Sequence, residues 1–158
     1  MVKALLMRHA QASWKAPSDR ERPLTHVGWD QARRAADSIV AHAAVPGRIL
    51  HSPWLRTTQT ANIIAERLGG IPCEALEALA PDSDIRLWGD CWQADGELLV
   101  SHQPMVSAYL SWLCEGSQQA RWPMEPASWA LLEAEYFEVG CGHLLQLRHA
   151  SDFDRSAI

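Results

Sequence analysis

Leu5-Leu6-Met7-Arg8-His9-Ala10, close to the N-terminus, is the segment from which the rest of the chain can be interpreted. Residues 4–7 form a short apolar run followed by polar, turn-prone residues, a pattern that predicts a buried strand. Arg8 and His9 then stand at its carboxyl end, and in open α/β sheets ligands bind at that edge. The alternative is a strand that leaves the core and becomes polar, and six residues do not separate the two readings.

Length and composition predict one domain spanning residues 1–158, with 47% hydrophobic residues to build its core. No segment approaches the roughly 18 apolar residues of a membrane helix, and the N-terminal apolar run is too short for a signal peptide, so we expect a cytoplasmic protein with no membrane partner. The net charge is −5 and no basic run is present, which argues against nucleic acid as a partner. Four widely spaced cysteines suggest reduced thiols rather than a zinc site.

Apolar periodicity predicts strands that alternate with helices. Helices are expected after Thr25, after Ser52-Pro53 and after Pro104, because each position has residues that favour a helix start. Weak helical character is expected over 83–93, and the last residues, Ser151 to Ile158, read as a frayed tail. The expected strands are 4–7, 48–51, one within 71–79, 97–102, 128–135 and 143–148.

This alternation predicts an α/β fold, a three-layer sandwich in which a mostly parallel sheet is flanked by helices on both faces. The last two strands are separated by a glycine-containing turn. They should therefore form a C-terminal antiparallel hairpin at the edge of the sheet.

Cationic groups from separate segments share one place in this scheme. Arg8 and His9 end the first strand, Arg56 falls in the first turn of a helix, and His102 ends a later strand. Each has an ordinary alternative: Arg56 as a surface residue, His102 as a satisfied buried histidine. Their common position at the carboxyl edge, where helix N-termini also point, instead favours binding of a dianion such as phosphate.

The motifs that carry these groups resemble a known family. Leu6-Met7-Arg8-His9-Ala10 resembles the signature of the histidine phosphatase superfamily, Ser52–Ala61 its Ser-Pro-x-x-Arg-x-x-Gln-Thr-Ala motif, and Ser101-His102-Gln103-Pro104 its third motif. With Arg22-Pro23-Leu24-Thr25-x-x-Gly28, they look most like the small SixA-type phosphohistidine phosphatases. The motifs run in order from residue 5 to about 110, and 115–158 resemble the family only loosely.

The resemblance implies a mechanism and the residues that perform it. His9 would be the nucleophile that forms a phosphohistidine intermediate, and Arg8, Arg56 and His102 would bind the phosphoryl oxygens. Arg22 resembles a further phosphate-binding arginine of the SixA type. No metal and no other cofactor is implied, because cationic side chains take that role. His9 must stay neutral, which the neighbouring Arg8, Arg56 and His102 should favour.

The general acid is the weak point of the resemblance. Many relatives carry a glutamate after the third strand, and the aligned position here is Ala78. Glu77 is the candidate, but it is one place away, which on a strand means the opposite face. Asp82 and Asp19 are further candidates, and all three also read as plain surface carboxylates.

Three functions remain open from the sequence. A phosphohistidine phosphatase is favoured, because a P–N bond tolerates the missing acid and because little sequence is left for a cap over the site. An open pocket of this kind would admit a phosphorylated protein, such as a histidine-containing phosphotransfer domain, and Trp14 and Trp54 could line its rim. The alternatives are a phosphatase for a small phosphate ester and a phosphoprotein-binding module without turnover.

Overall fold

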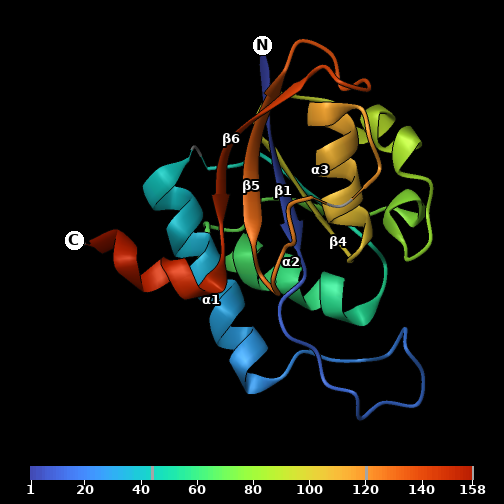
Figure 1. Ribbon diagram of the computed structural model, residues 1–158. Helices are drawn as coiled ribbons and strands as arrows, with labels where there is room; N and C mark the ends of the chain where they lie inside the picture. Colours follow the sequence, from blue (N-terminus) through green and yellow to red (C-terminus); the bar gives the residue numbers. More distant parts are fainter. Residues whose placement is uncertain (44, 120, 158) are drawn as a thin grey trace.

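Six strands form one sheet in the order β3-β2-β4-β1-β5-β6 (Figure 1). The structure is a computed structural model that describes residues 1–43, 45–119 and 121–157, of which 154–157 are described by their backbone alone. The strands are Val2–Arg8 (β1), Ile49–His51 (β2), Cys73–Ala75 (β3), Glu97–Ser101 (β4), Trp129–Ala134 (β5) and Gly142–Arg148 (β6).

The four strands from β3 to β1 are parallel, and β5 and β6 extend the sheet in antiparallel pairs. This confirms the predicted parallel sheet with a C-terminal hairpin at its edge. The parallel register aligns Arg8 of β1 with Ser101 of β4. The residues that follow these strands therefore emerge at one edge of the sheet.

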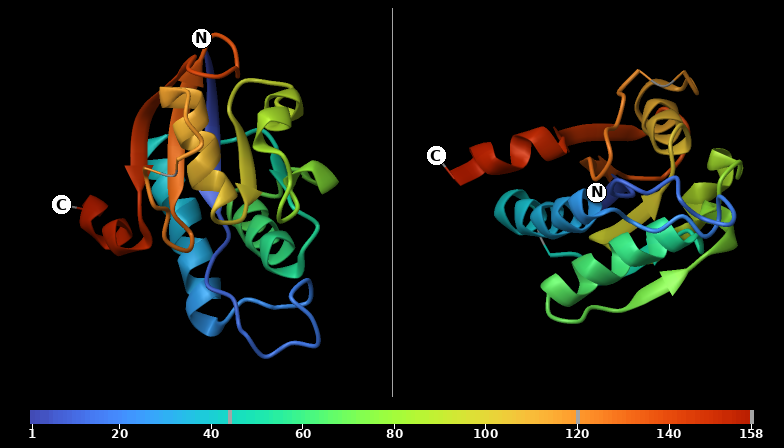
Figure 2. Two further views of the ribbon diagram at one scale, coloured as in Figure 1. Left: turned by 45° about the vertical axis from the view of Figure 1, so that its right-hand side comes forward. Right: turned by 90° about the horizontal axis from the view of Figure 1, so that it is seen from below.

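Helices cover both faces of the sheet and make three layers (Figure 2). Side chains alternate along β1, so Leu5 and Met7 pack into the core under α1 (His26–His42) and α2 (Leu55–Arg67). Leu6 packs into the opposite core with α3 (Met105–Glu115) and the short 3₁₀ helices η1 (Glu77–Leu79) and η2 (Ile85–Cys91). No helix of the described residues is long and apolar enough to cross a membrane.

One predicted boundary was wrong. The second helix begins at Leu55 rather than Pro53, and Ser52 does not cap it, because the Ser52 hydroxyl bonds to Trp54 N and to His102. The strand expected within 71–79 is confirmed as β3, and a 3₁₀ turn follows at Glu77.

The C-terminal segment is not a frayed tail over the described residues. Ala150–Ala157 forms a 3₁₀ helix (η3) that packs beside α1. Phe153 is buried in the core under α1. The Asp152 carboxylate accepts a hydrogen bond from His149 N, which holds the start of this segment. Ile158 lies outside the described residues.

Candidate functional site

The carboxyl edge of the parallel strands brings three chain segments together. His9 N donates to Ser101 O at 3.1 Å, and Ser52 N donates to Val100 O at 3.1 Å. These backbone bonds attach the segments after β1 and β2 to the end of β4, where His102 follows. The first and third motifs thus meet because their strands are neighbours.

His9 and His102 lie against each other in this edge. Their ring centroids are 5.4 Å apart in an edge-on arrangement, and the two residues are only 7% and 2% exposed. His9 Nδ1 lies 2.7 Å from the carbonyl oxygen of Ala10. Because a carbonyl can only accept, Nδ1 carries the proton and Nε2 of His9 keeps its lone pair.

Both histidines are held neutral. Burial is the largest cause that lowers the pKa of each ring to about 3, and nearby positive charge, including that of Arg56, adds to it. From the sequence we expected the cationic neighbours of His9 to keep its ring neutral. The structure shows that burial contributes more and that Arg56, Arg8 and Arg22 contribute less.

Arg8 and Arg56 are fixed by backbone carbonyls. Arg8 donates to Met124 O at 2.9 Å, and Arg56, which is 5% exposed, donates to Asp19 O at 2.7 Å. After burial, the charge of Arg56 is a further cause of the lowered pKa of Arg8, as it is for both histidines, so these four groups lie in one electrostatic environment. Arg8 Nε, Arg56 Nε and His102 Nδ1 are buried with no hydrogen-bond partner among the described residues.

Arg22 and Asp19 reach the site from the loop after β1. The Asp19 carboxylate accepts from Arg22 at 3.2 Å and from Arg56 at 3.2 Å. Burial acts to raise the pKa of Asp19, but the hydrogen bonds and charges of the two arginines outweigh it and hold that pKa below its usual value. Asp19 is therefore ionised near neutral pH and has no proton to give. From the sequence, Asp19 was one of the candidates for the general acid.

Two tryptophans lie on this rim, each with an arginine over its ring. Arg22 stacks on Trp14 at 3.6 Å, and Arg20 lies 4.5 Å from the Trp54 ring centroid. Trp54 also meets His102, with ring centroids 6.3 Å apart. Trp14 is 82% exposed, so it offers a large aromatic face to solvent beside the phosphate-binding candidates.

Glu77 does not join this group. It is exposed, lies in the 3₁₀ helix η1 and lines a surface hollow with Arg48 and Glu74. The argument from strand faces was wrong, because a 3₁₀ turn does not alternate its side chains as a strand does. Asp82 is exposed too, in a turn where its φ is +64°. Neither carboxylate has an interaction with the two histidines in the described part of the chain.

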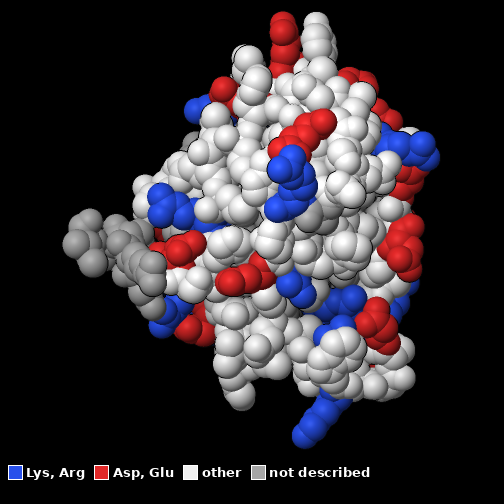
Figure 3. All heavy atoms as spheres, viewed as in Figure 1, with Lys and Arg blue, Asp and Glu red and all other residues white. Residues whose placement is uncertain are grey.

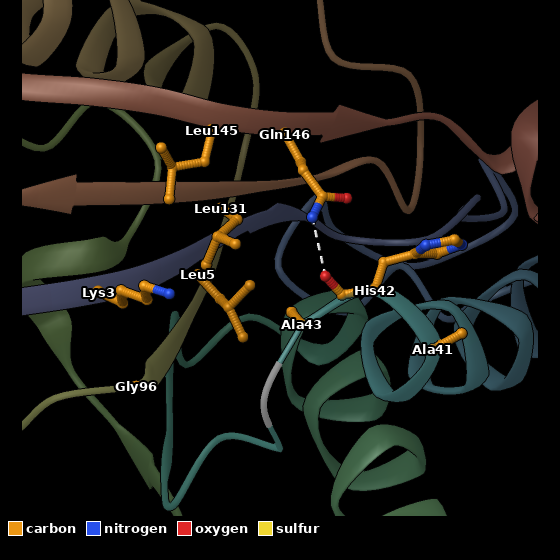
Figure 4. A pocket seen from close by; sticks show the side chains of 9 residues that line it. All are labelled: Lys3, Leu5, Ala41, His42, Ala43, Gly96, Leu131, Leu145 and Gln146. Carbon is orange, nitrogen blue, oxygen red and sulfur yellow. Dashed lines mark hydrogen bonds between the residues drawn. The ribbon is translucent and has the colours of Figure 1, made fainter.

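A second hollow lies at the other end of the sheet (Figure 4). It has a volume of about 430 Å³ and is lined from the start of β1, the end of α1 and β6, including Lys3, His42 and Gln146. The Gln146 side chain donates to the backbone oxygen of His42 there. None of the predicted site residues lines it, so it is separate from the candidate site.

The face of the molecule in Figure 3 carries no broad basic surface over the residues that the structure describes. On the face shown in Figure 3, acidic and basic side chains are interspersed. In the described residues, no group of three or more His, Cys, Asp or Glu side chains is arranged to hold a metal ion. The site is built from guanidinium and imidazole groups, which suit an oxyanion.

The sequence analysis missed two residues that hold side chains of the candidate site in place. Met124 lies far along the chain, and it acts through its backbone oxygen, which no side-chain pattern announces. Ser52 was read as a helix cap, whereas its hydroxyl lies 2.8 Å from His102 Nε2. The Ser-Pro motif itself was the available signal for Ser52.

Comparisons with known proteins identify the family of this chain. A family model described as the histidine phosphatase superfamily (branch 1) matches residues 4–81. The phosphohistidine phosphatase SixA of Escherichia coli K12 is 33% identical over 123 residues, which cover 73% of this chain and 76% of that protein.

Solved structures show the same fold. A structure of the protein histidine phosphatase SixA complexed with tungstate superposes with a TM-score of 0.85 at 28% identity, covering 95% of this chain and 98% of that one. A phosphoserine phosphatase from Entamoeba histolytica, in complex with 3-phosphoglyceric acid, superposes with a TM-score of 0.69 at 18% identity, over 94% of this chain and 97% of that one, which shows a shared fold only. From its motifs, its fold and its identity to SixA, the chain belongs to the histidine phosphatase superfamily.

Proposed function

We propose that this protein is a phosphohistidine phosphatase that removes phosphate from a histidine of another protein through a covalent intermediate on His9. The observation that carries the proposal is the state of the His9 ring. The ring is buried and neutral, and its one N–H, at Nδ1, donates a hydrogen bond to Ala10 O. Nε2 is then a free nucleophile beside Arg8, Arg56 and His102. The tungstate complex of SixA supports an oxyanion site of this kind, because tungstate is a tetrahedral oxyanion like phosphate.

The reaction would proceed in two displacements on phosphorus. In the first, His9 Nε2 forms a P–N bond while the P–N bond of the substrate breaks. When the other ring nitrogen of the substrate carries a proton, the ring leaves as neutral imidazole and takes no proton from the enzyme. Arg8, Arg56 and Arg22 would stabilise the charge on the equatorial oxygens during transfer.

In the second displacement, water attacks phospho-His9. His9 Nδ1 still bears its proton, donated to Ala10 O, so the phosphorylated ring is an imidazolium and leaves as neutral imidazole. The protons of the attacking water stay with the released phosphate. Neither step draws a proton from a protein carboxylic acid.

Among the described side chains no carboxylic acid that could protonate a leaving group lies at the site, which favours the phosphoramidate over an ester. An alkoxide leaving group is strongly basic and needs a proton donor, and the carboxylate in contact with the site, Asp19, is held ionised by two arginines. Glu77 is exposed and lines a separate surface hollow. A small phosphate ester stays the second candidate substrate.

We further infer that residues 1–158 act as one domain with no cap over the site. The segment between β3 and β4 contains only short 3₁₀ helices, and β4 leads directly into α3. Such a site would be open to a histidine on a protein surface. A cytoplasmic location stays a prediction.

Substrate competition tests the proposal. We expect kcat/KM for a phosphorylated histidine-containing phosphotransfer domain to exceed that for sugar phosphates, nucleotide phosphates and phosphoserine by at least about a hundredfold, roughly 3 kcal/mol of transition-state binding. His9→Ala should abolish hydrolysis. A clear preference for any of the esters would overturn the proposal.

A further inference from the structure

The tautomer of His102 decides what this ring presents to the site. His102 Nε2 lies 2.8 Å from Ser52 Oγ. His102 Nδ1 is buried and has no hydrogen-bond partner within the described ranges. A neutral imidazole carries one proton, so Nδ1 is either a donor or a lone pair.

Ser52 settles this choice, because its hydroxyl proton has a single destination. Ser52 is fully buried, and its Oγ accepts a hydrogen bond from the backbone N–H of Trp54 at 3.3 Å. A backbone N–H cannot accept in return. In the part of the chain that the structure describes, the other polar contact of Oγ is His102 Nε2. The hydroxyl must therefore donate to Nε2, and Nε2 must be the unprotonated nitrogen.

We propose that Ser52 is a positioning residue that holds His102 in the Nδ1–H tautomer, so that the neutral ring donates a hydrogen bond to a phosphoryl oxygen. The nature of that acceptor rests on the proposed function, but the tautomer does not. The opposite tautomer would bury a hydroxyl proton with no acceptor. It would also set an Nδ1 lone pair against oxygens that carry only lone pairs.

The two adjacent histidines would then have different roles, each set by the hydrogen bond that one ring nitrogen makes with the protein. The carbonyl of Ala10 accepts a hydrogen bond from His9 Nδ1–H and leaves Nε2 free to attack. The hydroxyl of Ser52 occupies Nε2 of His102 and leaves the Nδ1 proton free to bind oxygen. One ring acts as a nucleophile and the other as a donor, and neither needs to be an imidazolium.

Nuclear magnetic resonance tests the tautomer without any substrate. In protein labelled with ¹⁵N-histidine, a two-bond ¹H–¹⁵N correlation distinguishes protonated from unprotonated ring nitrogens, and a His102→Asn spectrum assigns the signals. At pH 7 we expect His102 of the wild type to have a protonated Nδ1 and a bare Nε2. Ser52→Ala should move the proton toward Nε2, and Ser52→Thr, which keeps the hydroxyl, should retain the native pattern.

A matched control separates this role from general packing. Ser38 is also buried, and its hydroxyl accepts from the Trp129 indole in the core under α1, so Ser38→Ala should leave the His102 signals unchanged. A protonated Nε2 in the wild type, or the same tautomer in Ser52→Ala as in the wild type, would overturn the proposal.

Kinetics give a second readout. Ser52→Ala should lower kcat for phosphohistidine hydrolysis by roughly ten- to a hundredfold, the loss typical of removing a residue that orients a functional side chain, and by less than His102→Ala. Ser52→Thr should restore most of the rate. If the wild type shows the expected tautomer but never hydrolyses phosphohistidine, the proposed function fails and the role of Ser52 in setting the tautomer stands.

Discussion

Lowering the pH from 7 to 5 should destabilise this fold through His9 and His102. Both rings have a pKa of about 3 in the folded protein, against about 6.5 in an unfolded chain. The unfolded chain therefore takes up two protons as the pH falls below 6.5, while the folded protein stays unprotonated at these sites until near pH 3. Stability is present above pH 6.5 and is lost progressively toward pH 3.

The size of the effect follows from these values. At pH 5 each ring lowers the free energy of unfolding by about 2 kcal/mol, so the pair contributes about 4 kcal/mol, a large part of the stability of a small domain. Urea unfolding in phosphate-free buffer at the two pH values measures it. The double variant His9→Asn/His102→Asn should lose most of this pH dependence, and His26→Asn, at an exposed position on α1, should keep it. Equal stability at both pH values, or an equally steep fall in the double variant, would refute the reasoning.

Three further outcomes are expected. Gly28→Ala should lower the free energy of unfolding in urea by ~1–3 kcal/mol, because the new Cβ would collide with the carbonyl oxygen of Gln11. Gly47→Ala, whose Cβ would meet open space, should leave stability unchanged, and equal effects of the two variants would contradict the packing. Glu77→Gln should change kcat by less than about twofold, and a large loss would restore Glu77 as the general acid. Trp14→Ala should raise KM severalfold for a phosphorylated protein and much less for free phosphohistidine, and equal changes would exclude a contact with the protein substrate.

How far the sequence predicted the site depended on where each group lies. Arg8 ends a buried strand, His9 and His102 follow buried strands, and Arg56 lies in the first turn of a helix, so topology alone placed them at one edge. Glu77 is exposed, as expected for a surface carboxylate, but the argument that placed it on a strand was wrong, because the chain forms a 3₁₀ turn there.

Two other features of the structure could not be predicted from the sequence pattern. The carbonyl of Met124 orients Arg8, and any residue could supply a backbone oxygen. The short helix η3, which begins at Ala150, was expected to be a frayed tail, but Phe153 is buried in the core under α1, a tertiary contact that the local sequence does not encode.

A single-turnover experiment on His9 tests the phosphatase mechanism most directly. Excess enzyme is mixed with a protein that carries ³²P-labelled phosphohistidine, quenched at short times under alkaline conditions, and digested for peptide mapping. We predict a transient label on the peptide that contains His9, its decay as free phosphate appears, and no label in His9→Ala. Release of phosphate with no labelled enzyme at any time, or a label on another residue, would contradict the mechanism, and binding without any transfer would identify a phosphoprotein-binding module instead.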